Sequence, residues 1–524
     1  MKTKLLFPIT LLPLLLSCSK SYSFKEFVFN NLVEDEFVEK VNEGYKLVGN
    51  FNPIKTRDKQ FNSFDEVFQS PYGLNKEVAH INLHGTGEQK LLVIPIDFEE
   101  HPSSNLPKNA IELIENAFFG QDSANQYYSV SSFYAKSSLD RLHIKGKVAP
   151  EWFRSSKYTY SALAEVTSPV SQNAHLKDLY NEAISWYQEK YDDIDDFKFK
   201  DISGKDRIPV YFIYSAPYSG YKDTKSSHSS MFWAFTCNSP TPISWSSFFM
   251  LHESEGKIDS HTLIHETGHI FGLKDYYDTT SYGSSSLVAA LGRADMMDCS
   301  LGDHNSFTKM LLDWCRPYEL NGDCSITLHS FQGNNEFILV PSNNYNGSVF
   351  DEYLLLEFYT PTLLNYTDST KRNDDAMKLF STCGVKIYHV DARLALFPGS
   401  FTTYTSMLTE NSTVGISRVD VAFNNDLSKR GSKIDTSNCL IQLLSAETNT
   451  SDLLPYFVAS DENKDMKVED GNIAMRRSLF KAGEGINENM FTDFRWHKDG
   501  TELGYNITVS TLTSSFATIT FSKK

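Results

Sequence analysis

The chain has too few basic residues for a nucleic-acid-binding protein. Its 524 residues include 49 Lys and Arg against 66 Asp and Glu, which gives a net charge of −17 at pH 7. A surface with this excess of negative charge repels a phosphate backbone. The sequence also lacks a polar region extensive enough to force disorder, since 40% of its residues are hydrophobic and 22% are charged. These absences indicate a globular protein that does not bind nucleic acid.

No later segment is apolar enough for a membrane-spanning helix, but the N-terminus has the pattern of an export signal. Lys2 and Lys4 precede an apolar run over residues 5–16, shorter than the roughly 20 residues needed to cross a bilayer. The run ends in Leu-Leu-Ser-Cys, which resembles a bacterial lipobox. We predict a signal peptide over 1–18 and a lipid on Cys18 that anchors the protein to the cell membrane outside the cytoplasm. The alternative is ordinary cleavage and release.

Cysteine is scarce as well, with seven in the chain. If Cys18 carries lipid, six remain, and an even number in an exported chain permits disulfides without specifying their pairing. Cys315 and Cys324 bracket a turn-rich loop, so they either close it as a local disulfide or are buried thiols. The six are Cys237, Cys299, Cys315, Cys324, Cys383 and Cys439.

The chain is too long for one ordinary core, and its sequence pattern changes along its length. Residues 19–85 form a polar lead segment, either a spacer or a pro-region. Over 86–325, buried-strand patterns such as KLLVIPIDF, LHIKGKV and DRIPVYFIYSA alternate with helical ones such as AHLKDLYNEAISWYQEKY. Over 326–524, strands such as EYLLLEFY, GVKIYHVDA and FATITF are separated by turn residues. We predict an α+β fold, with a mixed domain over 86–325 followed by a β-rich, sandwich-like C-terminal domain over 326–524.

The stretch HETGHIFGLKDYYD, from His265 to Asp278, carries the chemistry. On a helix, His265 and His269 lie on one face, because residues four apart are one turn apart, and they can bind a single metal ion. Glu266 points to the side of that metal, where it can take a proton from the attacking water instead of acting as a ligand. Before the helix, Asp259 or Ser260 is the expected N-cap.

Gly272 follows the second histidine by three residues and can adopt the left-handed conformation that ends a helix. The chain can then turn back beneath the metal, which makes Asp275 the third ligand and Asp278 a brace outside the ligand set. Zinc in a hydrolase takes three protein ligands and keeps one position open. The sequence therefore predicts a catalytic Zn²⁺ site. A structural Ca²⁺ ion cannot be read from the sequence.

Further candidates follow the helix. In RADMMDCSLGDHNSF, Met297 rather than Met296 is expected in a tight turn beneath the metal, although a methionine is commonly just core. His304 either donates a hydrogen bond to the tetrahedral intermediate, as a transition-state stabiliser, or is a surface-loop histidine. Tyr276 and Tyr277 have the same role or pack the turn, and packing is favoured.

Two residues outside this region are less informative. His389, in the apolar stretch IYHVDAR, is expected to be a satisfied structural group rather than a ligand. Trp233, in HSSMFWAF, either lines a substrate wall or belongs to the core.

The motifs resemble those of the immune inhibitor A family of secreted zinc metallopeptidases. HETGHIFGLKDYYD, DMMDCSLGDHNSF and LLDWCRPY carry the resemblance, which extends from about Lys90 through GVKIYHVDARL to a looser C-terminal part. Asp275 stands where the long zincin pattern has a histidine. The resemblance implies a zincin-type catalytic domain, a β-rich domain after it, and hydrolysis of peptide bonds.

We therefore expect a zinc endopeptidase that acts on extracellular proteins or peptides, with Glu266 as the proton carrier. One alternative is a surface-anchored binding or adhesion lipoprotein with a structural or inactive metal site. Another is a hydrolase of peptide crosslinks or glycoproteins. The intact Glu266 argues against the first alternative, because a structural zinc site needs no base and usually has four protein ligands. The sequence contains no subsite from which the substrate can be read.

Overall fold

The fold is taken from a computed structural model. The predicted signal peptide with Cys18, and also Asp278 and Cys299, lie outside the residues that it describes. The described residues are 21–23, 45–47, 82–125, 127–166, 169–201, 204–218, 230–237, 241–251, 253–254, 257–277, 290–292, 294–298, 301–343, 345, 349–370, 379–397, 406–407, 418–421, 429–430, 433–434, 439–444, 478–487 and 494–524.

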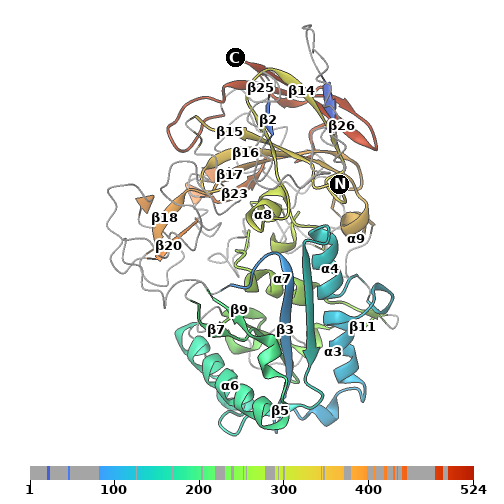
Figure 1. Ribbon diagram of the computed structural model, residues 1–524, viewed down its shortest axis with the longest axis vertical. Helices are drawn as coiled ribbons and strands as arrows, with labels where there is room; N and C mark the ends of the chain where they lie inside the picture. Colours follow the sequence, from blue (N-terminus) through green and yellow to red (C-terminus); the bar gives the residue numbers. More distant parts are fainter. Residues whose placement is uncertain are drawn as a thin grey trace, which may run out of the picture.

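A mixed sheet forms the centre of the first half of the chain (Figure 1). Its first four strands in sheet order are parallel and the edge strand β9 is antiparallel, with β5 (Phe153–Arg154) paired to β3. The order is β4 (Leu142–Val148), β3 (Gly87–Asp97), β8 (Val210–Tyr214), β10 (Ile243–Ser247) and β9 (Phe235–Cys237). The buried, apolar character of β3 and β8 is typical of parallel strands covered on both faces.

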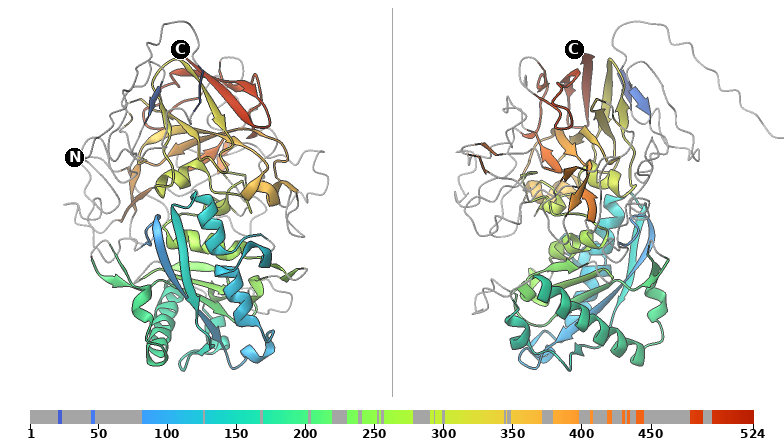
Figure 2. Two further views of the ribbon diagram at one scale, coloured as in Figure 1. Left: turned by 45° about the vertical axis from the view of Figure 1, so that its right-hand side comes forward. Right: turned by 90° about the vertical axis from the view of Figure 1, so that its left-hand side faces the viewer.

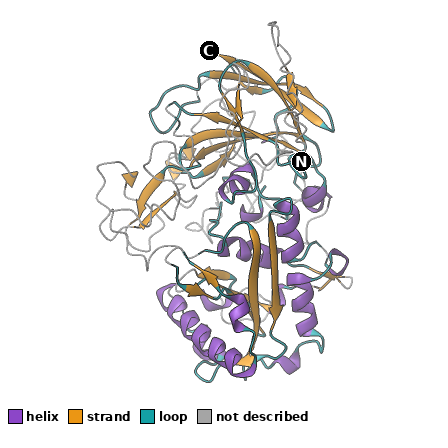
Figure 3. Cartoon of the chain, in the orientation of Figure 1, coloured by secondary structure: helices purple, strands orange, loops and turns teal. Residues whose placement is uncertain are grey.

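Helices cover both faces of this sheet (Figure 3). Alternate residues of β3 and β8 pack in one core with α3 (Ala110–Phe119), α4 (Val130–Ser137) and α7 (His261–Ile270). The other residues of the same strands pack with α5 (Tyr160–Ala164) and α6 (Pro169–Lys190). The amphipathic patterns in the sequence correspond to these buried faces, so α7 is held against the sheet.

Two further sheets make up the strand-rich second half, which stacks on the first in each view (Figures 1 and 2). One has the order β2 (Tyr45–Leu47), β13 (Tyr318–Leu320), β15 (Phe337–Pro341), β16 (Glu352–Tyr359), β17 (Gly384–Asp391) and β23 (Ile441–Leu443). The other has the order β1 (Ser21–Ser23), β14 (Cys324–His329), β26 (Phe516–Lys523), β25 (Tyr505–Leu512) and β24 (Gly485–Ile486). Buried residues from both sheets form a single hydrophobic cluster.

The halves of the chain also share a core. The cluster that contains α3, α4 and α7 continues into the outer faces of β15, β16 and β17, through residues such as Leu339, Leu355 and Val390. The helix α8 (Ser306–Leu311) lies between them, with Phe307 and Met310 in the same cluster. The strand-rich part is therefore packed directly against the helices that carry the candidate site.

The lead segment and the domain boundary differ from a simple linear division. Two short strands of the lead segment, β1 and β2, join the strand-rich sheets, and Leu83 packs in the core and donates its amide to Ile270 O over 3.0 Å. The strand-rich part starts with β13, so the predicted boundary at 325/326 falls inside β14. The observed division differs from the predicted one because strands pair with segments that are distant in the sequence, and local patterns do not reveal such pairing.

The remaining elements are short. They are α9 (Tyr366–Thr370), β6 (Phe199–Lys200), β7 (Asp206–Arg207), β11 (Glu253–Ser254), β12 (Lys257–Ile258), β18 (Leu394–Phe397), β19 (Ser406–Met407), β20 (Arg418–Val421), β21 (Lys429–Arg430) and β22 (Lys433–Ile434). The fold is thus mixed, with helices and several mixed sheets, as an α+β chain requires. Among the described helices, none has the length and apolarity to cross a membrane.

The cysteines in the described ranges are thiols. Cys315 and Cys324 are buried and unbonded, so the disulfide alternative for their loop is wrong. Burial raises the pKa of the Cys324 thiol to about 12, and burial also raises that of Cys315, so both are protonated and unreactive near neutral pH.

We predict that Cys315 and Cys324 are both alkylated by iodoacetamide in denaturant without reductant, and resist alkylation in the folded protein. Mass spectrometry of the tryptic peptides measures this, and a sample reduced before alkylation is the control. A 315–324 crosslinked peptide that appears only without reductant would contradict the assignment.

Candidate metal centre

The helix α7 presents the histidines, and local contacts explain where it begins. Ser260 occupies the cap position but makes no side-chain cap; its hydroxyl donates to Tyr128 O instead. The Asp259 carboxylate accepts the His261 amide over 3.0 Å, so one of the first amides of the helix is satisfied by that side chain. Leu263, Ile264 and other apolar residues of α7 are buried, which leaves His265 and His269 on the opposite, partly open face.

Gly272 ends the helix as predicted. Its φ is +89°, a left-handed conformation that side chains rarely adopt, and a Cβ there would lie 2.3 Å from Asn82 Nδ2. The Gly272 amide donates to His269 O over 3.0 Å and the Leu273 amide to Gly268 O over 3.2 Å, which closes the helix end. The reversal brings the following segment back over α7.

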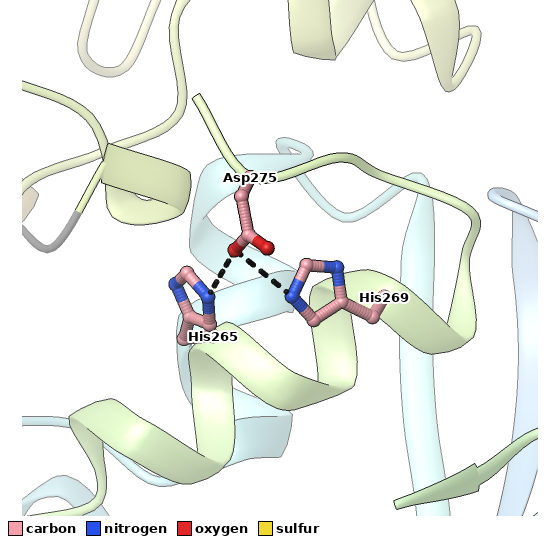
Figure 4. A group of neighbouring side chains, drawn as sticks. All are labelled: His265, His269 and Asp275. Atoms are coloured by element: carbon pink, nitrogen blue, oxygen red, sulfur yellow. Dashed lines mark hydrogen bonds and ion pairs between the residues drawn. The ribbon is translucent and has the colours of Figure 1, made fainter. Parts of the chain in front are cut away.

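Three donor atoms converge above the helix (Figure 4). Asp275 Oδ1 lies 3.1 Å from His265 Nε2 and 3.2 Å from His269 Nε2. The side chains of His265, His269 and Asp275 are 13%, 17% and 26% exposed, so the group is enclosed but open on one side. One ligand atom from each of the three residues lies within 4.8 Å of the other two, close enough to bind one metal ion. The predicted ligands are therefore together.

Each imidazole is oriented by its other nitrogen. His265 Nδ1 lies 2.8 Å from Met296 O and His269 Nδ1 lies 2.8 Å from Leu273 O. A carbonyl only accepts, so each Nδ1 carries a proton and donates it, and the Nε2 lone pair of a neutral ring faces Asp275. Carbonyl partners of this kind orient metal-binding histidines and fix their tautomer. The two Nε2 lone pairs and the Asp275 carboxylate oxygen repel one another unless a cation lies between them.

Without a metal, protons on the imidazoles supply this positive charge. Burial lowers the pKa of His269, but the charges of Asp275 and Glu266 and the hydrogen bonds to Asp275 and Leu273 together outweigh burial and raise it to about 9. The pKa of His265 is also raised. Burial works against ionisation of Asp275, yet the charges and hydrogen bonds of the two imidazoles hold its pKa well below the usual range. A divalent ion would displace these protons. Two imidazoles with a carboxylate suit zinc better than Ca²⁺ or Mg²⁺, which prefer oxygen ligands alone.

Glu266 lies beside the trio and not within it. Its side chain is buried, and Oε2 accepts a hydrogen bond from Thr236 Oγ1 over 2.9 Å. Thr236, on the edge strand β9, is 2.8 Å from Ser244 Oγ on β10, so a hydroxyl chain leads to the carboxylate. Burial raises the pKa of Glu266, while His269, His265 and the Thr236 hydrogen bond lower it. The sequence analysis missed Thr236, because contact across strand and helix has no local signal.

Met297 lies beneath the helix, as predicted. A Cβ at Gly268 would be 2.6 Å from Met297 Sδ, so the glycine in HETGH allows the close approach. Met297 belongs to the one-turn helix over Met296–Asp298, and its amide is held by Asp295 Oδ1 over 2.7 Å. Met296 has a different role, because its carbonyl orients His265. Met297 therefore packs against the helix, while the adjacent Met296 orients the ligand His265.

The tyrosines differ from each other. Tyr276 is buried; its hydroxyl lies 2.6 Å from Thr308 Oγ1 and its amide donates to Met297 O over 2.9 Å. It packs the turn, as favoured. Tyr277 is half-buried and stacks on the ring of His265 with centroids 6.2 Å apart, so it lies beside the ligand.

His304 does not have the environment expected of a transition-state stabiliser or of a surface loop. Its side chain has no exposed surface, and the ring packs against Phe133, Tyr134 and Trp314. Neither ring nitrogen has a hydrogen-bond partner. A side chain enclosed in this way is out of reach of a substrate. The prediction failed because sequence position next to the methionine turn does not specify the direction of a side chain.

The two remaining candidates have clear environments. Trp233 is 44% exposed whereas its neighbours Met231 and Phe232 are buried, so the aromatic run is divided between surface and core. His389 is buried and its Nε2 lies 2.8 Å from Glu352 Oε1, so its ring has a polar partner, as expected of a structural histidine.

We predict that the apparent zinc affinity rises with pH from about 6.5 to about 9, because zinc must displace the proton that His269 holds up to its pKa of about 9. Competition with a chelator, titrated at each pH, measures this. The zinc-free protein should change in the opposite direction. The raised pKa of His269 stabilises the protonated fold below 6.5, and this stability is lost as the pH rises through 9. A zinc affinity independent of pH in this range would contradict the ligand assignment.

Comparisons with known proteins do not add a name to this site. A scan of the chain against models of known protein families finds no match, and no curated protein matches the sequence either. The resemblance indicated by the motifs therefore stays a prediction.

Proposed function

We propose that the protein is a zinc-dependent endopeptidase in which His265, His269 and Asp275 hold the metal and Glu266 transfers the proton. The observation that supports this most is the convergence of two oriented Nε2 atoms and one carboxylate oxygen beside a separate, buried carboxylate. A structural zinc site usually has four protein ligands and needs no adjacent base, whereas a catalytic one has three and an open position.

Zinc, when bound by these residues, would supply a Lewis acid that polarises the scissile carbonyl and makes a water acidic near neutral pH. Glu266 performs the proton transfers. Thr236 occupies Oε2, which leaves Oε1 to accept the proton from the attacking water and to pass it to the leaving amine. Burial of the carboxylate raises its proton affinity toward the range needed for this exchange.

The sheet edge next to the site supports a peptide substrate. The strand β9 is the last in its sheet order, and its Thr236 contacts the catalytic carboxylate. An extended peptide that adds along such an edge has its backbone aligned beside the helix α7. Trp233, two residues before β9 and 44% exposed, offers an apolar surface to a substrate side chain.

The finer architecture and location belong to the same proposal. The mixed sheet with α7 is a zincin-type catalytic domain, and the two strand-rich sheets that share a hydrophobic cluster are a sandwich-like second domain. Lipid on Cys18 would anchor the enzyme to the cell membrane, where it acts on extracellular proteins or peptides. A binding lipoprotein with an inactive metal site is the competing function, and the ordered Glu266–Thr236 contact favours the enzyme over it.

We predict that Glu266→Gln binds zinc normally but loses at least about 100-fold in kcat, since general acid–base catalysis typically contributes that much or more. Asp275→Ala should instead lose zinc on dialysis, because it removes a ligand. Zinc content by atomic absorption and hydrolysis of casein measure the two effects. Glu112→Gln, an exposed carboxylate on α3, is the control. Turnover by Glu266→Gln at the rate of the native chain would overturn the role of the base.

We predict that Thr236→Val lowers kcat/KM by about 10–100-fold, the value of one hydrogen bond to a charged group. The lost bond normally lowers the pKa of Glu266, so the acidic limb of the pH–rate profile should move to higher pH. Thr241→Val is the matched control, because Thr241 donates to Ile208 O over 2.9 Å and has no contact with Glu266 in the described structure. An unshifted acidic limb in Thr236→Val would show that Thr236 does not position the base.

A further inference from the structure

A second polar cluster lies within the strand-rich half. The antiparallel strands β16 and β17 pair Glu352 with Asp391 and Leu354 with His389. Because side chains alternate along a strand, Glu352, His389 and Asp391 lie on the face whose other residues, such as Ile387, form the core shared by the two strand-rich sheets. The segment 494–498 crosses this end of the core, with the Phe494 ring 4.9 Å and the Trp496 ring 5.9 Å from the His389 ring.

Glu352 connects the strands to that segment. Its Oε1 accepts the His497 amide over 2.6 Å and lies 2.8 Å from His389 Nε2, and its Oε2 accepts the Lys498 amide over 2.7 Å. The rings of His389 and His497 are 4.5 Å apart. Glu352, His389 and His497 each have one ligand atom that lies within 4.8 Å of the ligand atoms of the other two, as in the trio that includes His265 and His269 on α7.

His497 is the member whose ring has the longest polar contact. Its Nδ1 is buried and makes no hydrogen bond, and the nearest recorded carboxylate oxygen, Asp391 Oδ2, is 3.7 Å away. The side chain of His497 is 14% exposed, while those of His389 and Glu352 are 2% and 0% exposed. A buried ring nitrogen that lies 3.7 Å from a carboxylate oxygen, beyond hydrogen-bond distance, leaves its polar capacity unused, and a bound cation would satisfy it.

The surrounding charges allow a cation. Arg393 binds Asp391 through two hydrogen bonds of 2.7 and 2.6 Å, and Lys498 Nζ lies 2.8 Å from Asp351 Oδ1. These two cations face three carboxylates, those of Asp351, Asp391 and Glu352. The carboxylates thus exceed these two cations by one, so the cluster can accommodate a further positive charge.

We propose that Glu352, His389 and His497 bind a second divalent metal ion of the zinc class. Two imidazoles and one carboxylate are the same donor set as on α7, and this set favours zinc over Ca²⁺ or Mg²⁺. Asp391 or a water completes the coordination. Because Glu352 and His389 are buried and His497 is only 14% exposed, the role is structural: the ion ties the segment 494–498 to the paired ends of β16 and β17. The site is independent of the proposed hydrolase function.

The competing arrangement has no metal. A neutral His389 would donate its Nε2 proton to Glu352, and His497 Nδ1 would pair with Asp391 Oδ2 across 3.7 Å. Zinc stoichiometry of the full chain separates these arrangements. The native chain, loaded with zinc and dialysed, should hold about two ions, and the His265→Ala/His269→Ala variant should still hold about one. Adding His497→Ala should remove that ion.

A matched control is His329→Ala, because His329 Nδ1 lies 3.0 Å from Glu336 Oε2, another His–carboxylate pair in the strand-rich half, but one outside both ligand clusters. This change should leave the zinc count at one in the His265→Ala/His269→Ala background. Cobalt loaded into that background should give visible absorption bands that His497→Ala abolishes. Thermal unfolding of each variant, with and without zinc, checks the fold.

The proposal is overturned if the His265→Ala/His269→Ala variant holds no zinc and its Tm is unchanged by added zinc. That result does not depend on whether His497→Ala folds. It also leaves the α7 site untouched, since the native chain would then hold one ion. If the native chain and the His265→Ala/His269→Ala variant each held one ion, the second site would stand and the α7 site would fail.

Discussion

The direction of two imidazole rings is the constraint on which the candidate site depends. Each ring of His265 and His269 gives its Nδ1 proton to a backbone carbonyl, so its Nε2 is available to a metal. The two carbonyls come from different places: Leu273 follows the helix directly, whereas Met296 belongs to the turn beneath it. A helix with the same motif but without these carbonyls would present freely rotating rings.

The supporting contacts extend outward from the methionine turn. Asp295 accepts the Met297 amide on one oxygen and the Asn305 amide, at the start of α8, on the other. Glu357 on β16 accepts the Ser306 amide over 3.0 Å, so the first turn of α8 is held by the strand-rich half. The second half of the chain is thus part of the support of the site, which explains why the two halves share a hydrophobic core.

The first half of the chain supports α7 and Glu266 from the side of its mixed sheet. The parallel strands β3, β8 and β10 are covered on both faces, and α7 lies on the face that carries Ser244 and Ser246 of β10. The hydroxyl chain from Ser244 through Thr236 to Glu266 is a polar path in an otherwise apolar interface. It holds the carboxylate without neutralising it, so Glu266 stays able to take up a proton.

Local sequence determined the elements and the ligand spacing. The apolar patterns predicted β3, β4, β8 and α6, because burial of one face or both faces leaves a direct record in the order of apolar residues. The interval of four residues between the histidines, and the glycine that ends the helix, likewise depend on helix geometry alone. Asp275 followed from that turn. Residues close together in the sequence are enough to determine these features.

Only the tertiary structure decided the contacts between distant segments. Thr236 reaches Glu266 across 30 positions, and Met296 orients His265 across 31 positions, which no local pattern encodes. The same limit explains the error at His304, whose ring is enclosed by Phe133, Tyr134 and Trp314. It also explains why only the structure decided between the two alternatives for Cys315 and Cys324, in favour of buried thiols. It also explains why His389 was identified only as a satisfied histidine. Its partners Glu352 and His497 come from another strand and from a segment 108 positions away, and only the packed sheets bring them together.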